Sequence, residues 1–206
     1  MIQSRMQYRV YVLAIICWVA GAGQVKAQGL DLKILQCINP SQPDAVFWQT
    51  TSSSAYWIPA AASLGTLGTG YLQKNKKLQQ NGYELFMSIG ISSLLSSGLK
   101  VTINRPRPAE THPETIYVNT YSTGRSFPSG HTTVAFATAA TISLQYKKWY
   151  ITVPAYVWAA AVGYSRMYLG RHYPTDVLGG AAVGIGSAYL SHWLSKKIFK
   201  QPAAKR

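Results

Sequence analysis

Five apolar segments follow one another along the 206-residue chain, separated by short polar connections and one longer loop. Each segment is close to the roughly 20 residues that cross a bilayer as an α-helix. Gly, Ala, Ser and Thr are frequent in them, as expected where helices pack closely within lipid. The pattern predicts an all-α fold, a polytopic membrane helical bundle with spans at about 55–72, 83–103, 130–146, 149–168 and 177–194.

A shorter apolar run precedes these five segments. Arg5 and Arg9 lie close to its start, the run covers residues 10–23, and Val25-Lys26-Ala27 fits a small-residue cleavage site. Because the run is short for a membrane span, we expect residues 1–27 to be a cleaved signal peptide. The alternative is an uncleaved first membrane helix, which would raise the number of spans from five to six.

Residues 28–54 are mixed and polar. We expect a polar, interfacial segment here, with a short amphipathic helix at residues 30–35 that lies on the membrane surface. A membrane domain over residues 55–200 follows. The two cysteines, Cys17 and Cys37, are too few for a disulfide framework and are expected to be inert small apolar residues.

Charged residues make up only 13% of the chain, about half the share that is usual in soluble domains. Little of the surface is therefore suited to water. The net charge is +14 at neutral pH, but the basic residues lie in short clusters between apolar segments and accompany no nucleic-acid-binding motif. Nucleic acid is not an expected partner.

Lysine clusters indicate how the bundle lies in the membrane. They follow the first, third and fifth apolar segments, so in a five-span chain they share one side, which the positive-inside rule makes cytoplasmic. Trp149, Tyr150 and Trp193 flank them like an interfacial aromatic belt. A soluble helical bundle agrees with the near-zero mean hydropathy, but it would not require this alternation. The lysines are Lys74, Lys76, Lys77, Lys147, Lys148, Lys196, Lys197 and Lys200.

The candidate chemical groups fall on the opposite, non-cytoplasmic side, in three stretches. In the first, Lys100 ends the second span and Arg107 lies on extended chain, because a residue before proline avoids the helical conformation. Basic residues at span ends are also common as interfacial anchors.

The second stretch, residues 126–131, has the pattern of a helix N-terminus with Ser129 as its N-cap. Unpaired backbone N–H groups and the helix dipole favour an anion at such an end. His131 lies in the first turn, and a histidine in a membrane segment is a functional candidate by default. A structural role is the alternative.

The third stretch holds Arg166, His172 and Asp176. A carboxylate four residues after a histidine can hold the Nδ1–H of the imidazole and raise the nucleophilicity of its other nitrogen. Guanidinium groups bind phosphate oxygens in pairs. A histidine–aspartate pair by itself is more often structural than catalytic.

Together the three stretches resemble the signature of the type-2 phosphatidic acid phosphatase family, which bacterial acid phosphatases and vanadium haloperoxidases share. The matching patterns are lysine, six residues, Arg-Pro; then Pro-Ser-Gly-His; then Ser-Arg, five residues, histidine, three residues, aspartate. They extend from Lys100 to Asp176. Membrane members of the family usually have six spans, a number this chain reaches only if its N-terminal run is retained.

The resemblance implies a role for each residue. His172 would attack phosphorus and form a phosphohistidine, Asp176 would orient His172, and His131 would protonate the leaving oxygen and then activate water. No metal or other cofactor is implied, because side-chain cations would neutralise the phosphate charge. The implied phosphate-binding groups are Lys100, Arg107, Arg166 and the backbone at Ser129 and Gly130.

Several neighbouring residues are left out of this set. Arg105 lies two residues from Arg107, so on extended chain it is expected to point the other way. Arg171 and Arg125 are as compatible with anchoring a loop as with binding a head group, and His112 and His192 lie outside the motifs.

We therefore expect a multi-pass phosphatase of a bacterial inner membrane that hydrolyses a lipid-linked phosphate or pyrophosphate at the periplasmic face. Three alternatives remain open. They are a periplasmic acid phosphatase acting on soluble monoesters, a vanadium haloperoxidase, and a non-catalytic phosphate-binding membrane protein.

Overall fold

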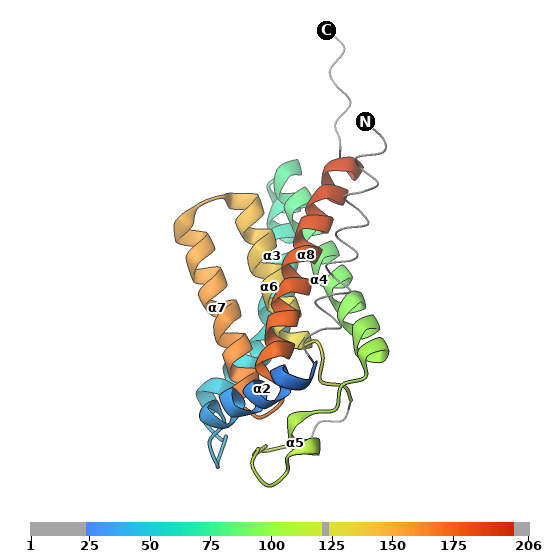
Figure 1. The fold of residues 1–206 in the computed structure, drawn as a ribbon. Coiled ribbons are helices and arrows are strands. Elements are labelled where there is room, and N and C mark those ends of the chain that lie inside the picture. Colours follow the sequence, from blue (N-terminus) through green and yellow to red (C-terminus); the bar gives the residue numbers. More distant parts are fainter. Residues whose placement is uncertain (1–23, 121–123, 200–206) are drawn as a thin grey trace, which may run out of the picture.

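The computed structural model describes residues 24–120 and 124–199, and within them it contains helices and no strand. Five long helices stand side by side, with α2 and the short α5 at one end of the bundle (Figure 1). In chain order the helices are α2 (Gln24–Ile38), α3 (Val46–Leu72), α4 (Lys76–Ile103), α5 (Pro108–Thr111), α6 (Gly130–Tyr146), α7 (Trp149–Tyr168) and α8 (Pro174–Ile198). The predicted all-α bundle is confirmed.

Helix α6 is the centre of the bundle and packs against α3, α4, α7 and α8. Its buried side chains are mostly Ala and Thr, which let the neighbouring helices come close. The tightest approach is to α8, where a Cβ on Gly184 would lie 2.3 Å from the carbonyl oxygen of Thr133. Glycine is required there because even a methyl group would collide with backbone. This contact fixes α6 against α8, and both helices begin at the same end of the bundle.

The distribution of apolar side chains suits a protein surrounded by lipid. Buried hydroxyls bond across helices, as Thr141 Oγ1 does to Ser88 Oγ at 2.9 Å and Ser191 Oγ to the carbonyl of Glu84 at 3.0 Å. Large apolar side chains face outward instead, and in water they would form an extended exposed apolar surface prone to aggregation. Those exposed include Leu64, Phe86, Leu94, Val153, Val157, Leu178 and Trp193.

Among the described residues, one helical stretch, Lys76–Thr111, is long and apolar enough to span a membrane by length and composition alone. The number of spans therefore stays a prediction.

The predicted segment bounds agree with the structure in the middle of the chain and fall short elsewhere. Helices α6 and α7 cover the predicted 130–146 and 149–168. Helices α3, α4 and α8 extend beyond the predicted segments because polar residues continue them at their ends. At the start of α4, for example, the Asn75 side chain accepts hydrogen bonds from the N–H groups of Lys77 and Leu78.

The region 28–54 is more helical than its polar sequence predicted. The predicted amphipathic helix at 30–35 lies within α2, and α3 begins at Val46. Serines favour turns because their hydroxyls compete for backbone groups, but Ser52 and Ser54 are buried in α3, and Ser54 Oγ accepts a hydrogen bond from Trp158 Nε1 at 2.9 Å. Helix α2 begins before Gln28 and so crosses the expected cleavage site. The rest of the expected signal peptide, residues 1–23, lies outside the described residues.

Candidate active site

The three stretches singled out in the sequence meet at the end of the bundle where α2 and α5 lie (Figure 1). The N–H of Ser129, before α6, donates to the carbonyl of Asp176 in α8 at 3.0 Å. Arg107 Nη1, from the loop after α4, donates to the carbonyl of Arg171, between α7 and α8, at 3.0 Å. Residues far apart in the sequence thus form one cluster.

His172 lies in the connection just before α8 and is only 2% exposed. Its Nδ1 has no hydrogen-bond partner among the described residues and lies 3.6 Å from Asp176 Oδ2. Burial, together with the charges of Arg166 and Arg107, lowers the pKa of His172 to about 3 against the opposing effect of Asp176. The imidazole is therefore neutral at neutral pH, the form in which one ring nitrogen has a lone pair available for attack.

The carboxylate of Asp176 is fully buried in the first turn of α8. Its Oδ2 accepts hydrogen bonds from the N–H of Tyr173 at 2.8 Å and from the Ser126 hydroxyl. Its Oδ1 accepts from Arg105 Nη1 at 2.7 Å. At 3.6 Å the direct contact with His172 is longer than a hydrogen bond. The orienting role of Asp176 stays a prediction that needs a small movement of the ring.

Lys100, Arg107 and Arg166 form what we call the cation cluster. Their positive charges are close enough to influence one another. Among the described residues, none of the three forms an ion pair with a carboxylate; the hydrogen bonds of their side chains go to oxygens without net charge. Lys100 Nζ donates to the carbonyl of Arg125 at 2.7 Å, Arg107 Nε to that of Gly124 at 3.1 Å, and Arg166 Nη1 to Ser52 Oγ at 2.5 Å.

Uncompensated buried charge is costly, and this cost is largest for Arg166. Arg166 is 8% exposed, and its Nε has no partner among the described residues. An anion bound at this point would neutralise the cation cluster and supply the missing hydrogen-bond acceptors. The cluster is therefore suited to a phosphate group.

The start of α6 supplies part of the predicted anion site. Ser129 is the N-cap residue, but its side chain makes no capping hydrogen bond, and its N–H is already bonded to Asp176. The Ser129 N–H is thus engaged within the protein, and phosphate binding by the Ser129 backbone stays a prediction. The N–H groups of Gly130 and His131 open the helix and have no intrahelical acceptor. The His131 ring packs edge-on against Tyr56, with ring centroids 4.5 Å apart.

Some contacting residues were missed in the sequence. Arg105 was expected to point away from the site, yet it binds the carboxylate of Asp176 from behind. Ser52 and Tyr56 from α3 also reach the cluster, at Arg166 and His131. No short motif marks Ser52 or Tyr56, because their positions depend on how α3 packs against α6 and α7.

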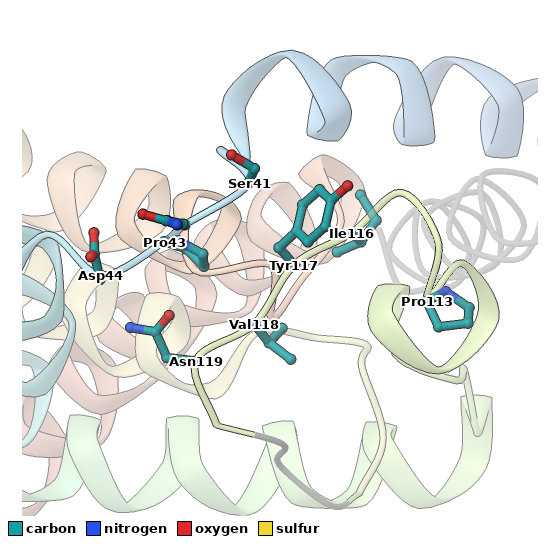
Figure 2. A pocket seen from close by; sticks show the side chains of 9 residues that line it. Ser41, Pro43, Asp44, Pro113, Ile116, Tyr117, Val118 and Asn119 are labelled. Atoms are coloured by element: carbon teal, nitrogen blue, oxygen red, sulfur yellow. The ribbon is translucent and has the colours of Figure 1, made fainter.

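A separate cavity of about 340 Å³ opens between the α2–α3 connection and the loop after α5 (Figure 2). None of the predicted site residues lines it. Its wall is mixed polar and apolar and consists of Ser41, Gln42, Pro43, Asp44, Pro113, Ile116, Tyr117, Val118 and Asn119.

Residues 82–200 match the PAP2 superfamily, which is more than half of the chain, and the protein therefore belongs to that superfamily. The predicted resemblance is confirmed. Among solved structures, the fold is similar to Aquifex aeolicus LpxE, with a TM-score of 0.64 and 28% identity over 80% of this chain and 95% of that one. It is also similar to a transmembrane PAP2-type phosphatidylglycerolphosphate phosphatase from Bacillus subtilis, with a TM-score of 0.69 and 22% identity over 93% and 96% of the two chains.

Characterised relatives include a lipid A 1-phosphatase of Porphyromonas gingivalis, which is 34% identical over 70% of this chain and 31% of its own length. An undecaprenyl-diphosphatase of Sulfolobus acidocaldarius is 28% identical over 79% of this chain and 77% of its own. The chain spans about a third of the length of the first of these relatives.

An anion should stabilise the protein through the cation cluster. Inorganic phosphate is expected to raise the unfolding temperature of detergent-solubilised wild type, with about 2.7 kcal/mol of stabilisation at a hundred times its dissociation constant. Arg166→Gln should lose most of this effect, measured by thermal unfolding at increasing phosphate concentration. Lys148→Gln, which removes an exposed cation before α7, is the matched control. An undiminished response in Arg166→Gln would contradict the site.

Proposed function

We propose that this protein is a membrane phosphatase that hydrolyses a lipid-linked phosphate or pyrophosphate through a phosphohistidine. The observation that carries the proposal is a buried neutral histidine next to cations whose side chains have no carboxylate partner in the part of the chain that the structure describes. His172 is 2% exposed, and Arg166 is 8% exposed with an Nε that has no hydrogen-bond partner within residues 24–120 and 124–199. A phosphate placed between them would meet a nucleophile on one side and charge stabilisation on the other.

The first step transfers the phosphoryl group to the enzyme. Nε2 of His172 attacks phosphorus, the bond from phosphorus to the leaving oxygen breaks, and His131 gives its proton to that oxygen. The cation cluster stabilises the charge that spreads over the equatorial oxygens. Asp176 stabilises the positive charge that develops on the imidazole of His172.

The second step releases inorganic phosphate. His131, now without its proton, removes a proton from water, and the resulting hydroxide attacks the phosphohistidine. The bond from phosphorus to Nε2 breaks, and His172 returns to its starting form. The same histidine thus acts first as an acid and then as a base. The edge-on contact with Tyr56 holds the His131 ring at the site end of the bundle.

A lipid substrate is supported by the position of the site and by the relatives. The site lies where membrane helices end, so the tails of a lipid could stay among the apolar side chains that cover the bundle. Relatives named for lipid A 1-phosphatase, undecaprenyl-diphosphatase and phosphatidylglycerophosphatase B act on lipid-linked phosphates or diphosphates. In each of these three substrate classes, Arg166 and the other cations of the cluster would contact the phosphate group that the classes share.

We also propose an inner-membrane location with the site facing the periplasm. The connections α3–α4 and α6–α7 and the end of α8 carry the lysine clusters, and all three lie at the end of the bundle opposite the site (Figure 1). The positive-inside rule supports a cytoplasmic position for that end.

Phosphate release from a panel of lipid phosphates tests the proposed activity directly. Detergent-purified wild type should release phosphate from at least one member of the panel. His172→Ala should lower kcat by roughly a thousandfold or more, because the nucleophile is lost. His192→Ala is the control and should keep kcat. His192 lies far from the cation cluster, where its Nδ1 is 2.9 Å from Glu84 Oε1.

Three other results would favour the alternatives. Release of the protein from membranes by high salt without detergent would favour a soluble acid phosphatase. Halide oxidation on addition of vanadate would favour a haloperoxidase. Lipid binding with no phosphate release from any member of the panel, in wild type and His172→Ala alike, would favour a non-catalytic binding protein.

The orientation can be tested at Cys37, which is exposed on α2 at the site end of the bundle. In a Cys17→Ser background, a membrane-impermeant maleimide should label Cys37 in intact spheroplasts. A variant with Cys37→Ser and Lys148→Cys should react only after the membrane is permeabilised, because Lys148 is at the opposite end. If intact spheroplasts show labelling of the Lys148→Cys variant and none of Cys37, the proposed orientation is contradicted.

A further inference from the structure

The guanidinium group of Arg105 joins two buried carboxylates, those of Asp176 and Asp31. Arg105 Nη1 binds Asp176 Oδ1 at 2.7 Å, and Arg105 Nη2 binds Asp31 Oδ2 at 2.7 Å. Asp31 is 3% exposed and Asp176 is 0% exposed. Asp31 belongs to α2, outside the region that matches the superfamily, which begins at residue 82.

Thr175 ties the same group to the beginning of α8. Asp31 Oδ1 accepts a hydrogen bond from the N–H of Thr175 at 2.9 Å, and its other oxygen accepts one from the Thr175 hydroxyl. Arg105 Nη1 also donates to Thr175 Oγ1 at 2.7 Å. Asp31 therefore satisfies an otherwise unpaired N–H at the start of α8, as an N-cap would, from a different helix. The next residue of that helix is Asp176.

The guanidinium has little freedom to move. Its Cζ lies 3.9 Å from the centre of the Tyr173 ring, and the Tyr173 hydroxyl is 2.8 Å from Thr111 Oγ1. Tyr173 in turn belongs to a buried apolar cluster with Leu35 of α2 and Ile116 of the loop after α5. This cluster holds α2 against that loop. Arg105 is thus fixed by two carboxylates at its tips and an aromatic ring on its face.

The sharing of Arg105 has an electrostatic consequence. In the proposed reaction, Asp176 must keep negative charge available for the cation that forms on His172. A guanidinium bound to Asp176 alone would neutralise much of that charge. Because Asp31 takes one edge of the guanidinium, Arg105 holds the Asp176 carboxylate in place while part of its positive charge is compensated elsewhere.

We propose that Arg105 and Asp31 are positioning residues for the reaction of His172. They fix the carboxylate of Asp176 and the first turn of α8, and they do so without contacting the substrate. This inference rests on the proposed phosphatase activity. It also gives the N-terminal helix α2 a function in catalysis, by way of one carboxylate.

Asp31→Asn tests this role, because it removes the charge while keeping the size of the side chain. With a lipid phosphomonoester in detergent micelles, kcat is expected to fall by roughly ten- to a hundredfold, as for a small misplacement of a catalytic group. The inhibition constant for inorganic phosphate should stay unchanged, because the cation cluster is untouched. Loss of folding would instead weaken phosphate binding together with kcat.

Three further variants complete the test. Lys33→Gln, on the exposed face of the same helix, should keep the wild-type kcat. Arg105→Lys keeps the charge but cannot bind two carboxylates with one planar group, so it should lower kcat as well. In the double variant Asp31→Asn with Arg105→Lys, the loss should be clearly smaller than the product of the two single losses, because both act through one network.

The outcomes separate this inference from the proposed function. Wild-type kcat in both Asp31→Asn and Arg105→Lys, with His172→Ala inactive, would overturn the positioning role and leave the phosphatase intact. Equal losses in kcat and in phosphate affinity would also overturn it, because they would indicate general unfolding of the site. Absence of phosphate release by wild type would remove the proposed function itself.

Discussion

The buried carboxylate of Asp176 is the constraint on which the site depends. It carries negative charge at a fully buried position, so every oxygen must be satisfied by a donor. Those donors come from separate parts of the chain: Arg105 after α4, Ser126 before α6, and the N–H of Tyr173 at the start of α8. Satisfying one carboxylate therefore draws together the segments that also carry Lys100, Arg107, His131 and His172.

The bundle makes this arrangement possible because its helices pack through small residues. A Cβ on Gly180 would lie 2.7 Å from the carbonyl of Ser129, so the N-terminal turns of α6 and α8 are in backbone contact. Hydroxyls fill the interior and the large apolar side chains face outward. Such a molecule is stabilised by close packing within lipid. Its charged site residues lie at the end of the bundle, outside the closely packed interior.

The sequence predicted the parts of the molecule that depend on local pattern. The bounds of α6 and α7 follow from continuous apolar runs between polar connections, and Lys100, Arg107, His131, Arg166, His172 and Asp176 follow from spaced motifs. Arg105 was excluded because alternation on extended chain turns it away from Arg107; it turns toward Asp176 instead. Asp31 and Ser52 could not be found in this way, since each contacts a partner more than 70 residues away across helix packing that no short pattern encodes. The predicted first span began at about residue 55, whereas α3 begins at Val46, because the hydroxyls of Ser52 and Ser54 bond to side chains of α7.

The central claim is that His172 carries the phosphoryl group during turnover. Rapid quenching of the His131→Ala variant with a lipid substrate labelled at its phosphate, followed by peptide mapping under alkaline conditions, tests it most directly. With a lipid diphosphate labelled at its terminal phosphate, the leaving phosphate needs little protonation, so loss of His131 should slow hydrolysis of the phosphohistidine more than its formation. The label is therefore predicted to accumulate on the peptide that contains His172. Label on another residue, or phosphate release in a single step without labelled protein, would contradict the account.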